Sequence, residues 1–272
     1  MRHNLKVSLP LAIIITLIAV IYQRSTGPTY PKKFKIGTNR DITVKFLRSQ
    51  GGTVNAPVEV PAIEGIKDVE LSYKRYPTHD DWTTLNLEKS GNLFKGELPA
   101  QPAAGKITYF LKINYGDSVQ ELGSKDDPIY IRYKGEVPTY ILAPHIVSMF
   151  MSMLLSVVAL FEAIFRTKLY KKVGRITLGF LMFGGMFLGP IVQKYAFDVY
   201  WAGFPFDWDL TDNKLLIGVL VWLFAVVMSL KSERRWPTIL AACTLFVVYS
   251  IPHSMQGSEY DYEQNKIITD RD

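Results

Sequence analysis

The segment YILAPHIVSMFMSMLLSVVALFEAIF, residues 140–165, decides the fold class of this chain. Its only charged residue is Glu162, and about 20 apolar residues are enough for a helix to cross a bilayer. Four more apolar segments of similar character occur along the chain, at residues 7–22, 173–192, 215–230 and 237–252. The sequence therefore predicts a polytopic α-helical membrane protein with five transmembrane helices.

Basic residues between these segments predict the orientation. They occur in the loop after the second segment and in the loop after the fourth, at Arg166, Lys168, Lys171, Lys172, Arg175, Lys231, Arg234 and Arg235. The positive-inside rule places both loops in the cytoplasm, and residues 193–214 outside. Residues 1–27 then form a cytoplasmic amino terminus with an uncleaved anchor, since no small-residue cleavage site follows it; the alternative is a signal peptide, because basic residues precede an apolar middle. The expected location is the bacterial inner membrane.

Residues 28–138 differ in character and predict an all-β domain on the periplasmic side. Apolar and polar residues alternate along 69–74 and 107–115, which is the pattern of half-buried strands. Turn signals separate these strands and four other short ones, at residues 42–44, 58–60, 93–98 and 129–131. This spacing is typical of a β-sandwich. The predicted fold is thus mixed, with a sandwich inserted before a four-helix membrane bundle at residues 139–253 and an outer acidic tail at 254–272.

The stretch from Trp82 to Ile113 resembles an immunoglobulin-like or fibronectin type III-like module. Trp82 is followed by a strand ending at Leu98, and Tyr109 then stands where such modules carry their tyrosine corner. The resemblance implies that Trp82 and Tyr109 are core residues. It also implies a domain that binds other proteins or acts as a spacer.

The order of these parts is similar to that of a bacterial membrane-protein family that pairs an outer immunoglobulin-like domain with a small helical bundle. The resemblance rests on several short segments: Val137-Pro138, Pro144-His145, residues 189–197, residues 209–214 and Pro252-His253-Ser254. It implies this architecture and a cell-envelope location, and it implies no particular reaction.

Composition excludes several classes of function. The net charge of +6 does not indicate a nucleic-acid partner, because the basic residues of the membrane half cluster in its predicted cytoplasmic loops. The single cysteine, Cys243, excludes a disulfide framework, a CxxC motif and a CxxCH haem attachment. The lipid bilayer and protein partners in a membrane complex remain as the expected contacts.

Two of the four histidines, His145 and His253, fall in the apolar half. His145 lies 21 residues before Arg166 and His253 lies 17 after Trp236. At about 1.5 Å per helical residue, both reach the outer edge of the hydrocarbon. Matched depth on two helices is what an axial pair on haem b needs. Met149, one turn after His145, offers a copper site as a variant, because imidazole and thioether together suit Cu(I).

Other residues of the membrane half carry simpler expectations. Gly185 and Gly189 form a GxxxG pattern, which lets another helix of this chain or of a partner approach closely. Asp212 is expected to cap the helix that follows it, and Glu162 to pair with Arg166 one turn later. The outer segment is also aromatic and predicts an interaction surface at Trp201, Phe204 and Trp208.

Two functions from different classes follow. The first is a membrane-anchored structural subunit of a cell-envelope complex, with the outer β-sandwich as its partner-binding module. The second is a redox subunit that holds haem b, or less readily copper, at His145 and His253 and transfers electrons. No catalytic residues are predicted, so the chain is not expected to be an enzyme on its own.

Overall fold

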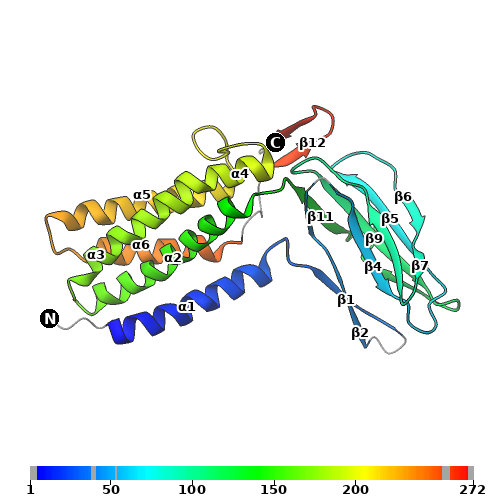
Figure 1. Ribbon diagram of the computed structural model, residues 1–272, viewed down its shortest axis with the longest axis horizontal. Coiled ribbons are helices and arrows are strands. Elements are labelled where there is room, and N and C mark those ends of the chain that lie inside the picture. The colour runs from blue at the N-terminus through cyan, green and yellow to red at the C-terminus, as the bar shows by residue number, and fades with distance from the viewer. Residues whose placement is uncertain (1–4, 38–40, 53, 253–257, 269–272) are drawn as a thin grey trace. The chain divides into compact units, whose positions relative to one another are not determined.

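The computed structural model describes residues 5–37, 41–52, 54–252 and 258–268. The chain divides into two compact units. The helical unit lies within residues 1–28 and 137–257, and the β-rich unit within residues 29–136 and 258–268 (Figure 1). The fold is therefore mixed, as the sequence predicts.

Two sheets dominate the β-rich unit. The larger has the strand order β3-β11-β9-β5-β6, with β10 also paired to β9, and the smaller has the order β4-β8-β7. Their bounds are β3 (Ser49–Gly51), β4 (Ala56–Pro61), β5 (Asp68–Tyr76), β6 (Thr83–Asn86), β7 (Glu88–Ser90), β8 (Leu93–Leu98), β9 (Lys106–Asn114), β10 (Val119–Leu122) and β11 (Ile129–Lys134). A separate hairpin precedes them, formed by β1 (Lys32–Ile36) and β2 (Ile42–Phe46).

The alternation along β9 explains the core. Ile107, Tyr109, Leu111 and Ile113 are fully buried in one apolar cluster together with residues of β4, β5, β8 and the first hairpin. The Tyr109 hydroxyl donates to the Leu47 carbonyl at 2.9 Å, and burial raises the pKa of Tyr109. Tyr109 is thus the core residue that the sequence predicts.

Trp82 does not share this core, and its predicted place is wrong. It lies just before β6 and is only half-buried. Its ring packs against Phe110, with the ring centroids 4.9 Å apart. Phe110 alternates with Tyr109 and Leu111 along β9, so it points to the opposite face of the large sheet. Trp82 therefore covers that outer face.

The carboxyl-terminal segment joins the β-rich unit through a hairpin of β12 (Glu259–Asp261) and β13 (Lys266–Ile268). Arg132 of β11 donates to the Ser258 carbonyl, and the Tyr260 amide donates to the Ala104 carbonyl at 3.3 Å. The tail and residues 29–136 therefore lie on the same side of any membrane that the helices cross, as the predicted topology requires.

The helical unit contains α1 (Leu5–Thr26), α2 (Thr139–Ile164), α5 (Leu210–Leu230) and α6 (Trp236–Ser250). A further continuous helix is built from α3 (Leu169–Phe180), the π-helical segment η1 (Leu181–Leu188) and α4 (Gly189–Phe197). Four of these five helices are long and apolar enough to cross a membrane, and α6, with 15 residues, is shorter. The chain is a membrane protein, and the count of five spans stays a prediction.

Polar contacts join α1 to the rest of the bundle. The Ser8 hydroxyl donates to the Glu162 carboxylate at 2.6 Å, and the Gln23 side chain donates to the Tyr249 carbonyl at 3.0 Å. The Thr167 hydroxyl also donates to Glu162, at 2.5 Å. The expected pairing of Glu162 with Arg166 is wrong, because α2 ends at Ile164 and Arg166, with a φ of 59°, no longer follows the helical spacing.

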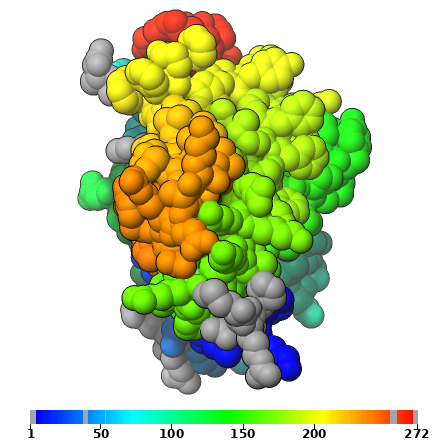
Figure 2. All heavy atoms as spheres, turned by 90° about the vertical axis from the view of Figure 1, so that its left-hand side faces the viewer, coloured from blue at the N-terminus to red at the C-terminus, as the bar shows by residue number. Residues whose placement is uncertain are grey.

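The two basic loops meet at one end of the bundle, as the predicted topology requires. Lys168 and Glu233 form an ion pair at 3.0 Å, and the Tyr170 hydroxyl donates to the Arg234 carbonyl at 3.4 Å. Figure 2 shows the green segment around residue 170 beside the orange segment that begins α6. The lysine of this pair holds the pKa of the Glu233 carboxyl below its usual range through a direct hydrogen bond.

Candidate interaction site

Residues 198–209, here called the aromatic loop, connect α4 to α5. The carboxylate of Asp209 caps α5 by accepting from the amides of Thr211 at 2.7 Å and Asp212 at 3.2 Å. The Asp209 amide also donates to the Ala202 carbonyl at 2.8 Å. The cap expected at Asp212 is therefore wrong, because α5 begins at Leu210 rather than at the first residue of the apolar run.

Asp212 and Asn213 instead fix the backbone of the loop from inside. The buried Asp212 carboxylate accepts from the Ala202 amide, and the Asn213 side-chain oxygen accepts from the Phe204 amide, both at 2.7 Å. A Cβ at Gly203 would lie 2.7 Å from the Asp212 Cβ, so only glycine fits there. The loop is thus held by hydrogen bonds to the first turn of α5.

The aromatic side chains of this fixed loop point outward. Phe206 is 80% exposed, Trp208 67% and Phe204 55%, and Tyr200 is similarly open. The rings of Phe204 and Trp208 lie 6.1 Å apart, and the half-buried Trp201 donates its indole N–H to the Phe204 carbonyl at 3.2 Å. The structure therefore places Trp201, Phe204 and Trp208, which the sequence singled out, in one fixed loop together with Phe206.

The predicted glycine contact lies inside this chain. A Cβ at Gly185 would lie 2.4 Å from Leu215 of α5, and a Cβ at Gly184 would lie 2.5 Å from Ser148 of α2. Gly189 makes only ordinary contacts, with the nearest atom at 3.7 Å. Gly184 and Gly185 therefore let η1 approach two helices of its own bundle, so this face is not left open for a partner helix.

His145 points at the same π-helical segment. Its Nδ1 lies 2.8 Å from the Gly184 carbonyl oxygen, which only accepts hydrogen bonds. Nδ1 is therefore the donor, and in the neutral imidazole Nε2 carries the lone pair. His253 lies outside the described residues, so its pairing with His145 stays a prediction. In the described part of the chain, no group of three His, Cys, Asp or Glu side chains could hold a metal. The Met149 sulfur lies 3.3 Å from where a Cβ at Gly184 would stand, and its role as a copper ligand stays a prediction.

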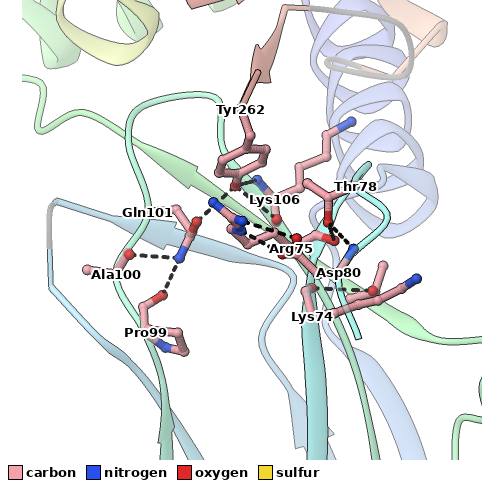
Figure 3. A network of polar contacts seen from close by, with 10 residues as sticks. Lys74, Arg75, Thr78, Asp80, Pro99, Ala100, Gln101, Lys106 and Tyr262 are labelled. Carbon is pink, nitrogen blue, oxygen red and sulfur yellow. Dashed lines mark hydrogen bonds and ion pairs between the residues drawn. The ribbon is translucent and has the colours of Figure 1, made fainter. Parts of the chain in front are cut away.

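A second polar network lies under the carboxyl-terminal hairpin (Figure 3). The Tyr262 hydroxyl donates to Gln101 Oε1 at 2.9 Å and accepts from the Lys106 amide at 3.2 Å. The Arg75 guanidinium lies 4.9 Å from the Tyr262 ring centroid and binds both carboxylate oxygens of Asp80, at 2.6 and 3.1 Å. Burial raises the pKa of Tyr262 to about 12, and the Arg75 hydrogen bond lowers the pKa of Asp80.

The network in Figure 3 was not predicted from the sequence, because it joins residues up to 161 positions apart. A scan of known protein-family models finds no match to the chain, and neither a curated protein nor a solved structure matches it. The resemblance to an envelope family therefore stays a prediction.

Proposed function

We propose that this chain is a membrane-anchored interaction subunit of a cell-envelope complex, and that the aromatic loop binds a protein partner. The observation that carries the proposal is a backbone fixed from inside beneath outward-pointing aromatic rings. Interface residues that dominate binding energy are enriched in Trp and Tyr. A loop that is already ordered also loses less conformational entropy on binding than a mobile one.

The bilayer interface also attracts aromatic side chains, and this is the competing explanation of the loop. Anchoring at the headgroups requires only that the rings reach the right depth. It does not require the carboxylate of Asp212 or the amide of Asn213 to hold the backbone of the loop in one conformation. Fixed presentation favours a partner with a fixed surface, which is a protein.

The β-rich unit is the second contact in this proposal. Its strands follow one another as in an immunoglobulin-like domain, with β4, β8 and β7 in the places of B, E and D, and β5, β9 and β11 in those of C, F and G. Such domains mostly bind proteins or act as spacers. The proposed location is the bacterial inner membrane with this unit on the periplasmic side, because the chain joins it to the end of α1 and the start of α2, whereas the basic loops follow the ends of α2 and α5.

Site-specific photocrosslinking in native membranes tests the proposal. A photoreactive phenylalanine analogue at Phe206 is expected to give a discrete protein adduct, whereas the same group at the exposed Leu17 of α1 is expected to give lipid adducts only. Replacing Phe204 and Trp208 together by Ala should abolish the protein adduct. Lipid adducts alone at Phe206 would show that the loop is an interfacial anchor.

The redox alternative is favoured by one observation, the hydrogen bond that fixes His145 Nδ1 and leaves Nε2 free. Ligating histidines usually hold their other ring nitrogen in this way. The visible spectrum of the purified full-length chain tests it. A haem absorption band that is lost in both His145→Ala and His253→Ala supports electron transfer, and a colourless, metal-free protein excludes it.

A further inference from the structure

The first hairpin of the β-rich unit has two faces of opposite character. Phe34, Ile36, Val44 and Phe46 point into the apolar cluster of this unit. Because side chains alternate along a strand, this packing fixes the register and turns the other residues outward. The outward face carries the exposed side chains of Lys33, Lys35, Thr43 and Lys45.

Three lysines therefore share a small face, here called the lysine face. Lys33 lies directly opposite Lys45 in the strand pairing, and Lys35 is opposite Thr43. Like charges placed directly opposite destabilise a strand pair. None of the three forms an ion pair with a described residue, whereas Lys32, on the inward face, lies 3.0 Å from Asp127. The Lys33 ammonium lies over the Tyr30 ring, 5.2 Å from its centroid, but no carboxylate among the described residues offsets the repulsion within the lysine face.

Positive charge is concentrated in this part of the domain. Residues 29–48 contain six basic residues and a single acidic one, whereas residues 49–136 contain ten basic and thirteen acidic residues. The lysine face is thus the cationic region of a domain that is otherwise slightly acidic. The ligand that it fits is an anionic surface.

Chain length limits how far this face can lie from the membrane. α1 ends at Thr26, and Lys33 follows seven residues later. A fully extended chain spans at most ~3.6 Å per residue, so Lys33 lies within about 25 Å of the end of α1. A lysine side chain and the screening length of about 8–10 Å at physiological ionic strength add to this reach.

We infer that the lysine face binds the anionic headgroups of the leaflet next to which α1 ends. The contact is between the ammonium groups of Lys33, Lys35 and Lys45 and lipid phosphates. Lysine suits this role because it is a flexible point charge and does not need the fixed geometry of an arginine fork. The occupant is lipid rather than an acidic protein because the chain tethers the face within about 25 Å of the end of α1, and because three flexible ammonium groups need no shaped surface opposite them. This inference does not depend on the proposed protein partner.

Edge protection is the simplest other explanation, since lysines on exposed strands also prevent aggregation. That role requires charge but no particular surface opposite it. Edge protection alone would leave the face equally solvated next to neutral and anionic lipids. The two explanations therefore differ in one measurable quantity, the dependence of headgroup proximity on lipid charge.

The experiment uses the full-length chain in vesicles of phosphatidylcholine, with or without a minority of phosphatidylglycerol. Thr43→Cys in a Cys243→Ser background receives a fluorophore, and a headgroup nitroxide lipid serves as quencher. Three lysines near an anionic surface raise the ratio of lysine faces bound to headgroups over unbound faces by on the order of 100-fold. Quenching is expected to rise with phosphatidylglycerol and to fall with added salt.

The variant K33Q/K35Q/K45Q should lose the rise in quenching. The matched variant K67Q/K89Q/K125Q removes three exposed lysines elsewhere and should keep it. Thermal unfolding checks the fold, and K33Q/K35Q/K45Q should be no less stable, since it removes like-charge repulsion. Equal quenching in both lipids, or a rise that survives in K33Q/K35Q/K45Q, overturns the inference. The inference is also overturned if the label at residue 43 is shielded in native membranes but not in the lipid vesicles. That result would identify an acidic protein as the occupant.

Discussion

The two units of this chain are packed by different means. In the β-rich unit the fully buried side chains are mostly large, such as Leu71, Ile107 and Leu111. In the helical unit they are largely small, such as Ala12, Ala159 and Ala241. Buried serine and threonine hydroxyls lie on the same helices. Burial of apolar surface drives folding in water, but lipid tails are as apolar as the core. A bundle in lipid instead depends on close backbone approach and on hydrogen bonds.

The largest expected effect is the loss of a large side chain from the β-rich core. Leu111→Ala should lower the free energy of unfolding of this unit by about 2–5 kcal/mol, because it removes apolar burial and leaves a cavity. Val119→Ala is the matched control, since Val119 is 61% exposed. Urea unfolding of the full-length chain in detergent, followed by the β-sheet circular dichroism, measures both. Equal midpoints would contradict a core held by burial.

In the helical unit the sensitive change is in the opposite direction, from small to larger. Gly184→Ala places a Cβ 2.5 Å from the Ser148 Cβ, so α2 and η1 must separate. Overpacking of this kind costs about 1–3 kcal/mol. Gly179→Ala is the control, because its Cβ would meet nothing within 4 Å. Unfolding in mixed micelles with increasing sodium dodecyl sulfate should occur earlier for Gly184→Ala only. The same shift in both variants would show that the change in unfolding reflects helix propensity rather than the distance between α2 and η1.

How far the sequence predicts this structure depends on the range of the contacts. Alternation within one strand placed β8 and β9 almost at their observed bounds, and the apolar runs located all five helices. β12 and β13 were missed and read as an acidic tail, because Arg132 and Tyr262 reveal their docking only in three dimensions. The aromatic residues of the loop were found from composition, but the hydrogen bonds that fix the loop were not. Asp209 and Asp212 both precede the apolar run, so either could serve as the cap.

The docked hairpin tests whether polar contacts stabilise the β-rich unit as well. The pKa of Tyr262 is raised from 10.0 to about 12 by burial, so the neutral hydroxyl is favoured in the folded state. Its contribution is fully present below pH 10 and is lost as the pH rises towards 12. The tyrosinate absorbance of wild type minus Tyr262→Phe should therefore titrate above the pH of exposed tyrosines. At neutral pH, Tyr262→Phe should lower stability by about 0.5–1.5 kcal/mol. Titration near pH 10 would mean that the hairpin is not docked.

The smallest effect is expected for the hydroxyl that ties α1 to α2. Ser8→Ala removes one of the two hydroxyl donors to the Glu162 carboxylate and leaves the Thr167 hydroxyl in place. Hydrogen bonds between membrane helices contribute about 0.6 kcal/mol on average, because the unfolded helices also find partners in the membrane. The loss should thus scarcely change the unfolding of the bundle as a whole.

The position of α1 is the more sensitive measure of this contact. Spin labels on the exposed faces of α1 and α2, at Leu11 and Val147, should report a broader distance distribution in Ser8→Ala than in wild type. Ser25→Ala is the control, because the Ser25 hydroxyl donates to the Tyr22 carbonyl of its own helix and to no other helix that the structure describes. If Ser8→Ala leaves the distribution unchanged, close packing at Ala12 and Ala19 and the Gln23 hydrogen bond to the Tyr249 carbonyl hold α1 without the Ser8 hydroxyl. For α1, the contrast with the β-rich core would then rest more on side-chain size than on this buried hydroxyl.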